Sequence, residues 1–295
     1  MEVKTGIDRL HLTVSTSYSL ETVISTLFEG LTLETHFRKV KNKLNKSGTC
    51  KGRTISWYRT SYYLENSENN KLVAIHTDHV SKLGKRNLVQ IHGLTFSESA
   101  LNSLRPINLE KLIGGAITMD ASISACDVYL DVIGGKIPIN QIRVQSLPHN
   151  YRSFIRSPFI RDRKNARTLP RPIGDSSIYY GGKGGNMCQI LLYQKHLDPH
   201  QKIYSEDNPL KFSWVRFELR LRKATAKRQM DVIQNLFPIF PEDQKTLGEI
   251  VADLFTRYFN FVEPTSNRVS RCPPQPWWEA LLATARTTPS CNTII

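Results

Sequence analysis

The sequence lacks the features by which a chain enters a membrane or is held together by disulfide bonds. No apolar run in its 295 residues approaches the roughly 20 residues that span a bilayer. The first residues, MEVKTGIDRLHLTVS, contain no basic segment followed by an apolar stretch, so we expect no secretory signal. We therefore expect a soluble cytoplasmic protein with no membrane partner.

Cysteine is scarce and scattered. The five cysteines are odd in number and form no Cys-x-x-Cys pair, which argues against both a disulfide framework and a zinc ribbon. We expect reduced thiols at all five positions, which are Cys50, Cys126, Cys188, Cys272 and Cys291.

Acidic residues are also few relative to basic ones. The chain has 26 Asp and Glu against 40 Lys and Arg, which gives a formal net charge of +14 at pH 7. Residues 38–53 contain seven basic residues and no acidic one, and residues 143–171 contain eight against the single Asp162. Tyr151, Phe154 and Phe159 are interleaved with the second cluster. Basic side chains with aromatic neighbours favour a nucleic-acid partner, whereas a solvated basic face is the alternative interpretation.

Short segments with alternating apolar and polar residues predict strands in the first half of the chain. Helices are predicted at residues 19–31, where Ser19 is a cap-like residue, and within residues 97–112. This order predicts an α+β fold built on an antiparallel sheet with flanking helices. The predicted strands are residues 8–14, 54–64, 72–76 and 88–92.

The pattern changes after Arg222. Residues 224–236 and 246–261 have the periodicity of amphipathic helices, and the tail RCPPQPWWEALLATAR follows. We therefore divide the chain into a catalytic domain, residues 1–222, and a basic helical region, residues 223–295, that binds DNA or packs on the first domain. Residues 148–176 combine four prolines with many arginines and predict a long exposed arm.

Two later strands gather charged residues on one face. In residues 125–132, ACDVYLDV, side chains alternate between faces, so Asp127, Tyr129 and Asp131 share one. The same rule gives residues 214–222, WVRFELRLR, a face with four charged residues: Arg216, Glu218, Arg220 and Arg222. Each charged face is equally well explained as the solvent-exposed side of an antiparallel sheet.

A third strand adds a tyrosine. In SIYYGGKGGNMCQILLYQK the glycine-rich part predicts a tight hairpin turn, and the returning strand puts Tyr193 and Lys195 on one face. If the three faces coincide, a tyrosine lies beside carboxylates and cations, as metal-assisted phosphoryl transfer requires. Hard oxygen ligands select Mg²⁺ or Mn²⁺, and the candidate ligands are Asp127, Asp131 and Glu218. Taken alone, Tyr193 is better explained as a packed aromatic residue than as a nucleophile.

The order of these segments resembles the replication initiation factor family, which includes plasmid rolling-circle initiators, filamentous-phage replication proteins and conjugative-element relaxases. The resemblance runs from about Ile7 to Leu282 and is carried by GIDRLHLTV, LVQIHG, CDVYLD, IYYGGKGGNMCQILLYQK, WVRFELRLR and PWWEALL. It implies that Tyr193 is the nucleophile that links to DNA, with Lys195 beside it. It also implies that metal ligands and phosphate contacts come from Asp127, Asp131, Arg216 and Glu218.

The resemblance implies an activity and partners. The expected reaction is metal-dependent, origin-specific nicking of one DNA strand through a 5′-phosphotyrosine intermediate, followed by rejoining. The expected location is the cytoplasm of a bacterial host, and the expected partner is origin DNA, with a host helicase and a second copy of the chain as further candidates. A conjugative relaxase has the same chemistry, and a non-catalytic origin-binding or copy-control protein is the alternative from another class.

Two positions depart from the family pattern. Leu191 and Ala125 stand where family members commonly carry arginine, so we expect Arg220 or Lys183 to supply phosphate contacts. The histidine motif of other rolling-circle nickases is absent, and we expect His76, His79, His196 and His200 to be surface residues. Further candidate DNA contacts lie in the predicted arm: Arg152, Arg156, Arg161, Arg163, Lys164, Arg167 and Arg171.

Overall fold

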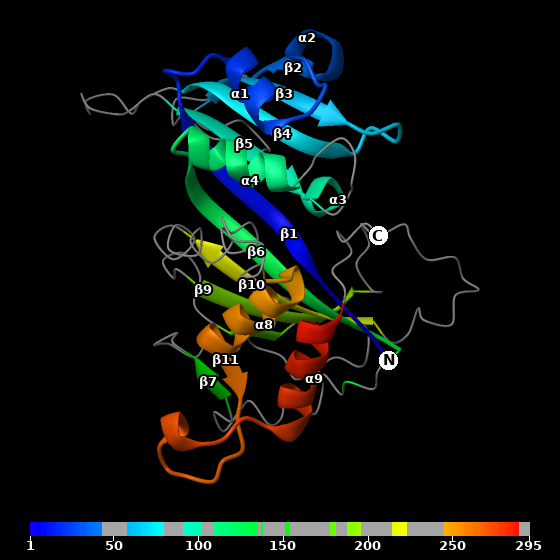
Figure 1. The fold of residues 1–295 in the computed structure, drawn as a ribbon, viewed down its shortest axis with the longest axis vertical. Helices are drawn as coiled ribbons and strands as arrows, with labels where there is room; N and C mark the ends of the chain where they lie inside the picture. The colour runs from blue at the N-terminus through cyan, green and yellow to red at the C-terminus, as the bar shows by residue number, and fades with distance from the viewer. Residues whose placement is uncertain are drawn as a thin grey trace, which may run out of the picture. The chain divides into compact units, whose positions relative to one another are not determined.

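A computed structural model of the chain describes residues 1–42, 58–79, 91–101, 109–134, 137, 151–153, 178–180, 188–195, 214–222 and 245–288. Within these residues the strands form a nine-stranded sheet, in the order β2-β3-β4-β5-β1-β6-β10-β9-β8, and a two-stranded sheet, β11-β7 (Figure 1). The strands pair in antiparallel fashion, as in β1 with β5, β3 with β4, and β10 with β9. The predicted α+β fold on an antiparallel sheet is therefore confirmed.

Contacts divide the chain into two compact units. The first unit is Ile7–Cys126, and the second is Met1–Gly6 with Asp127–Ile295. Strands β1 (Glu2–Ser15) and β6 (Ser122–Ile133) each contribute residues to both units.

The first unit is a sheet with helices packed on it. Its other strands are β2 (Arg38–Lys41), β3 (Tyr58–Glu65), β4 (Lys71–His79) and β5 (Ile91–Ser97). Its helices are α1 (Leu20–Leu27), α2 (Leu33–His36), α3 (Glu98–Leu101) and α4 (Leu109–Thr118).

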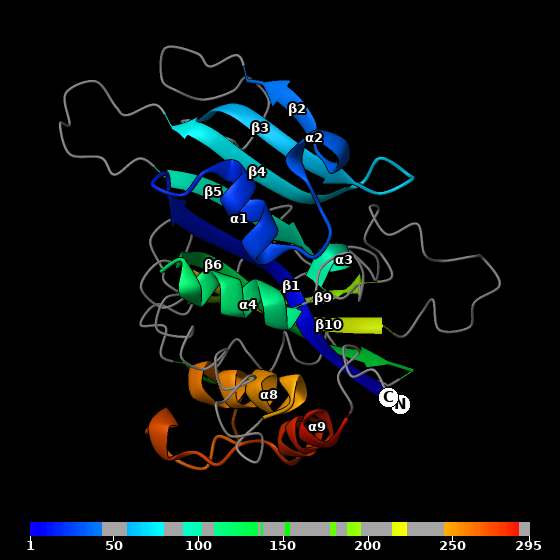
Figure 2. The same cartoon turned by 45° about the horizontal axis from the view of Figure 1, so that its top comes forward.

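Helix α1 forms where the sequence predicts it. The Ser19 hydroxyl accepts a hydrogen bond from the Thr22 backbone N–H at 3.1 Å, so Ser19 is the N-cap. Helices α1 and α4 lie side by side against the sheet in both ribbon views (Figure 2). Gly115 of α4 permits this approach, because a Cβ there would lie 2.7 Å from the Thr26 carbonyl oxygen.

The second unit carries the late strands and the C-terminal helices. Its elements are β7 (Tyr151–Ser153), β8 (Ile178–Tyr180), β9 (Cys188–Gln194), β10 (Trp214–Arg222), α8 (Leu247–Tyr258), β11 (Phe259–Phe261), a 3₁₀ turn at Val269–Arg271 and α9 (Pro276–Thr287). No helix among the described residues is long and apolar enough to cross a membrane.

The C-terminal helices pack on the sheet through an aromatic core. The Trp278 ring of α9 lies 5.3 Å from the ring of Phe217 on β10 and 5.8 Å from that of Phe255 on α8. An ion pair between Asp253 and Arg286, at 2.9 Å, joins α8 to α9. Helix α9 thus contacts both β10 and α8, and the predicted division into two domains stays a prediction. The predicted boundary near residue 223 lies outside the described residues and stays a prediction.

Two predictions of secondary structure need correction. The predicted helix 246–261 ends at Tyr258, and residues 259–261 instead form β11, which pairs with β7. Residues 151–153 of the predicted arm form that partner strand, while the rest of the arm lies outside the described residues. Helix 224–236 and the glycine-rich hairpin turn also lie outside them.

Candidate active site

The charged faces of β6 and β10 are buried. Asp127 and Asp131 are each 1% exposed, Glu218 is 2% exposed and Arg216 is 0% exposed. On the opposite side of β10, Phe217 meets Trp278, so the predicted alternation is confirmed. A solvent-exposed sheet face would leave these carboxylates in water. Burying four charged groups is costly unless they are paired or bind a charged ligand.

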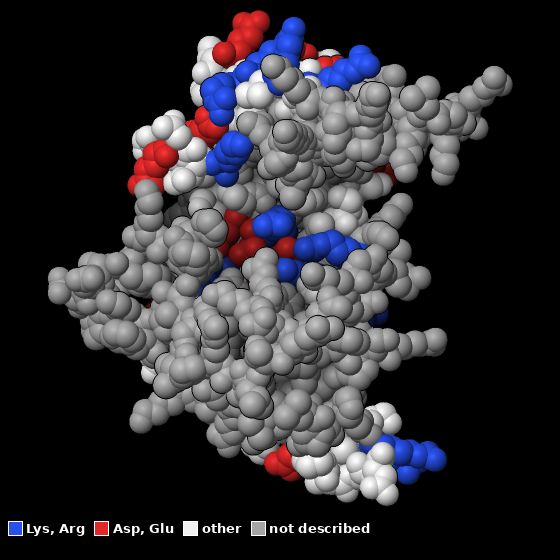
Figure 3. All heavy atoms as spheres, turned by 180° about the vertical axis from the view of Figure 1, so that it is seen from behind, with Lys and Arg blue, Asp and Glu red and all other residues white. Residues whose placement is uncertain are grey.

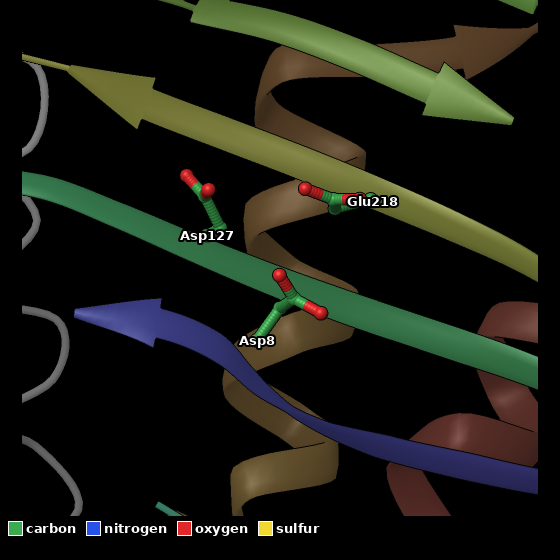
Figure 4. Close-up of side chains that lie close together, drawn as sticks. All are labelled: Asp8, Asp127 and Glu218. Carbon is green, nitrogen blue, oxygen red and sulfur yellow. The ribbon is translucent and has the colours of Figure 1, made fainter. Parts of the chain in front are cut away.

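Three carboxylates come together within this region. One oxygen each from Asp8, Asp127 and Glu218 lies within 4.8 Å of the others. Figure 4 shows the three side chains, from β1, β6 and β10, directed toward a common space. Three hard oxygen donors at this spacing suit Mg²⁺ or Mn²⁺, and their mutual repulsion favours the binding of a cation.

Arginines already balance two of these carboxylates. Arg222 donates to both oxygens of Asp127, with 2.9 Å between Nη2 and Oδ2. Arg220 Nε donates to Glu218 Oε1 at 2.6 Å. The two arginine side chains are about a third exposed, at 32% and 30%. Seen from behind Figure 1, acidic atoms lie next to lysine and arginine atoms near the middle of the view (Figure 3).

Asp131 lies outside the three-carboxylate cluster. Its two oxygens accept hydrogen bonds from Arg216 Nε and Nη2, at 2.6 Å and 2.7 Å. The Arg216 guanidinium also lies 3.6 Å from the centre of the Tyr129 ring. Arg216 is thus held on two sides and fully enclosed, which does not suit a group that must reach a phosphate.

Tyr193 lies on the charged face. In the antiparallel register of β9 with β10, Tyr193 is opposite Arg216 and Leu191 is opposite Glu218. Directly opposed residues project on the same side of a sheet, so the Tyr193 side chain shares the face of Arg216 and Glu218. Tyr193 is partly exposed, as a nucleophile that must meet DNA requires.

Lys195 follows β9 and is 1% exposed. Its ammonium lies 5.7 Å from the centre of the Tyr129 ring and 5.9 Å from that of Trp214. A buried cation over aromatic rings adds positive potential beside Tyr193. The structure therefore brings together Tyr193, Lys195, Arg216, Glu218 and the carboxylates of β6.

Not every predicted site residue falls among those that the structure describes. The side chains of the predicted arm and Lys183 are outside the described residues; only the backbone of Arg152 is described, on β7. The prediction that His76 is a surface residue is wrong, because it is 8% exposed. Its Nδ1 lies 2.8 Å from the Ser61 hydroxyl, and burial lowers its pKa to about 4. The other three of these histidines have no described side chain.

Three of the five cysteines fall among the described residues and are free thiols: Cys126, Cys188 and Cys272. Burial raises the pKa of Cys188 to about 12, so this thiol stays protonated and unreactive at neutral pH. The expectation of reduced cysteines is confirmed for these three.

Sequence reasoning missed Asp8. It lies in the segment GIDRLHLTV that carries the family resemblance, but it is 119 residues from Asp127 and 210 residues from Glu218. The available signal was that Asp8 is the single carboxylate of the segment GIDRLHLTV. Alternation along one strand cannot reveal which residue of a distant strand lies beside it.

Comparison with known proteins identifies the family and the fold of the chain. The family model for the replication initiation factor matches residues 122–292. Among solved structures, the chain is similar to the rolling circle replication initiator protein from Geobacillus stearothermophilus, with a TM-score of 0.69 and 20% identity over 99% of this chain and 100% of that one. At this identity the similarity shows the fold. No protein with a curated description matches the chain.

Proposed function

The chain belongs to the replication initiation factor family, and from this premise we propose that it initiates rolling-circle replication by nicking one strand of origin DNA. The observation that carries the proposal is the position of Tyr193, partly exposed and opposite Arg216 on a buried charged face. Five buried charged residues lie on β6, on β10 and just after β9, and burying them is costly unless they are paired or bind a charged ligand: Asp127, Asp131, Lys195, Arg216 and Glu218.

The proposed reaction is a transesterification. The Tyr193 oxygen attacks the phosphorus of one DNA phosphodiester, a tyrosine O–P bond forms, and the P–O3′ bond breaks. The tyrosine proton ends on the 3′ oxygen that leaves, so the products are a 5′-phosphotyrosine and a free 3′-OH. Because the phosphoester bond is conserved, attack by a 3′-OH reverses the step and rejoins the strand.

Surrounding cations have separate proposed roles. Arg220 and Arg222 are partly exposed and close to the carboxylates, so we assign them to the scissile phosphate. The buried ammonium of Lys195 offsets negative charge that builds up on the phosphate. Arg216 is a positioning residue, because Asp131 and Tyr129 already hold its guanidinium.

Asp8, Asp127 and Glu218 would hold the divalent cation. A bound Mg²⁺ or Mn²⁺ would polarise the phosphate and stabilise the leaving 3′ oxygen. The donor set fits this group because it offers only carboxylate oxygens, the ligands that hard cations prefer.

The proposed partner is origin DNA. Arginines of the predicted arm, together with Lys183, are proposed to contact its backbone, and a host helicase and a second copy of the chain remain proposed partners. The same site would serve a conjugative relaxase, whose substrate is a transfer origin.

The test is formation of a covalent adduct. Wild-type protein and Tyr193→Phe are incubated with end-labelled single-stranded origin DNA and Mn²⁺, then separated by denaturing electrophoresis. We expect Tyr193→Phe to lose the adduct while its DNA affinity changes by less than about twofold, because only one hydroxyl is removed. Tyr179→Phe is the matched control and should retain the adduct.

Each outcome decides between the candidates. An adduct in Tyr193→Phe would mean that another tyrosine is the nucleophile. Origin binding by the wild-type protein without any adduct at any Mn²⁺ concentration would identify a non-catalytic origin-binding protein.

A further inference from the structure

A second concave surface lies within the first unit. It is a hollow of about 710 Å³ on the sheet of β1, β3, β4 and β5. Its volume is in the range of clefts that hold small ligands, roughly 300–1,000 Å³. The proposed mechanism uses none of its residues except Asp8, which lines the hollow and also belongs to the carboxylate cluster.

Aromatic rings form part of the lining. Tyr58 lies close against Gly93, where an added Cβ would be 2.9 Å from the Tyr58 hydroxyl. The Tyr58 ring is 5.7 Å from the ring of His76, which also lines the hollow. The absence of a side chain at Gly93 is therefore what lets Tyr58 lie over the sheet and present an aromatic surface.

Tyr63 adds a second aromatic residue and an unsatisfied polar atom. The ammonium of Lys71 lies 4.1 Å from the centre of the Tyr63 ring. The ring is 2% exposed, and its hydroxyl has no hydrogen-bond partner among the residues that the structure describes. A buried hydroxyl without a partner is unfavourable, and a hydrogen bond with a ligand would satisfy it.

The charges of the hollow favour the bases of a ligand over its phosphates. Arg9 and Lys71 are offset by Asp8 and Glu98, so the lining has no excess of positive charge. Carboxylates accept hydrogen bonds from exocyclic amines of bases, and aromatic rings stack on base faces. A duplex hides its base faces, whereas a single strand exposes them.

We propose that this hollow binds unpaired bases of the DNA strand that is nicked. The proposal rests on the proposed function, because the ligand is the DNA strand that is nicked, and Asp8 both lines the hollow and belongs to the three-carboxylate cluster. Tyr58 stacks on a base, and Lys71 contacts the backbone.

The test measures the affinity of a fluorescent 12-nucleotide deoxycytidine strand, whose bases carry an exocyclic amine, by anisotropy, with EDTA present so that no cleavage occurs. We expect Tyr58→Leu to weaken binding by about 5- to 100-fold, the effect of losing one stacked base. Tyr58→Phe keeps the ring and should bind within about twofold of wild type. Tyr258→Leu, at a partly exposed tyrosine of the second unit, is the matched control and should bind normally.

A second variant tests the proposal if Tyr58→Leu fails to fold. Lys71 is exposed, so Lys71→Gln should melt as wild type does, yet it should flatten the dependence of log affinity on log salt by about 0.7 for a single strand. Normal oligonucleotide binding by a folded Tyr58→Leu protein would overturn the proposal. So would an equal loss of affinity for single-stranded and duplex DNA of the same length.

The adduct assay separates this proposal from the proposed function. Binding of the deoxycytidine strand that depends on Tyr58, in a protein that never forms an adduct, would support the proposed role of the hollow and contradict nicking. Adduct formation together with affinity that is insensitive to Tyr58 would do the reverse.

Discussion

The two ends of the charged face of β10 pair their buried carboxylates with arginines that differ in exposure. At one end, Arg216 is fully enclosed and makes two parallel hydrogen bonds to Asp131. At the other end, Arg220 and Arg222 pair with Glu218 and Asp127, but about a third of each arginine side chain remains in solvent. The carboxylates at both ends are buried to the same degree.

This difference in exposure suggests different roles for Arg216 and for the two partly exposed arginines. An enclosed arginine cannot change partners without leaving a charge buried and unpaired, so the Arg216 end fixes the geometry beneath Tyr193. A partly exposed arginine can move between a carboxylate and a phosphate at little cost, because water solvates it in between. The Arg216 end therefore holds the site in place. The end with Arg220 and Arg222 is suited to contact the phosphates of DNA.

The largest expected effect comes from breaking the enclosed pair. Asp131→Asn removes the partner of Arg216 and leaves a buried guanidinium, so we expect a loss of about 3–5 kcal/mol in the free energy of unfolding. Urea denaturation measures it. Glu65→Gln is a matched control, because Arg38 binds Glu65 through the same two nitrogens at a solvent-exposed site. Similar losses in the two variants would contradict the special role of the enclosed pair.

His76 is a buried group that is neutral instead of ion-paired, and it can be compared with the buried ion pair of Arg216 and Asp131. Burial lowers the pKa of His76 to about 4, whereas in the unfolded chain it is near 6.5. Between these values the unfolded state binds more protons than the folded state, so the free energy of unfolding should fall as pH drops from 6.5 to 4. The loss at the lower limit is about 3 kcal/mol.

His76→Asn should make this pH dependence shallower in urea melts at pH 4 to 7. Some dependence should persist, because burial also lowers the pKa of His92. Parallel pH profiles for the variant and the wild type would show that His76 does not carry the effect.

The next effect concerns the carboxylates at the partly exposed end. A cation that binds only the folded protein stabilises it by about 2.7 kcal/mol at a concentration one hundred times its Kd. Glu218→Gln removes one of three anionic donors, so Mn²⁺ should raise the melting temperature less than in wild type. Asp253→Asn, at a carboxylate on α8 that does not belong to the cluster, should respond as wild type does. Equal responses in Glu218→Gln and wild type would exclude Glu218 as a ligand.

These effects depend on pairings that the sequence predicts only in part. Alternation along WVRFELRLR correctly separates Arg216 and Glu218 from the apolar face, because side-chain direction in a strand is a local property. The choice of partners is not local. Asp127 and Asp131 are equivalent in ACDVYLD, yet one joins Asp8 and the other binds Arg216.

Strand and helix ends show the same limit. The predicted helix 246–261 continues the apolar periodicity of α8 through Phe259, but residues 259–261 gain a strand partner in β7, more than 100 positions earlier in the sequence. Burial of His76 likewise follows from Ser61 on the neighbouring strand. Local pattern thus predicts the elements, while tertiary pairing decides where they end and which polar groups are enclosed.

The smallest expected effect tests whether the partly exposed end contacts DNA. Arg222→Gln keeps a hydrogen-bonding side chain next to Asp127 but removes one positive charge from the surface of the site. If Arg222 neutralises one phosphate, the slope of log affinity against log salt should flatten by about 0.7 for single-stranded DNA. Fluorescence anisotropy titrations between 50 and 200 mM salt, roughly the range in which phosphate contacts dominate, measure this slope.

Arg257→Gln, at an exposed arginine in the last turn of α8, is the control for a nonspecific loss of charge and should leave the slope unchanged. Because Arg216 is enclosed while Arg222 reaches solvent, an unchanged slope in Arg222→Gln would mean that both ends of β10 only balance carboxylates, and that phosphate contacts lie on other elements.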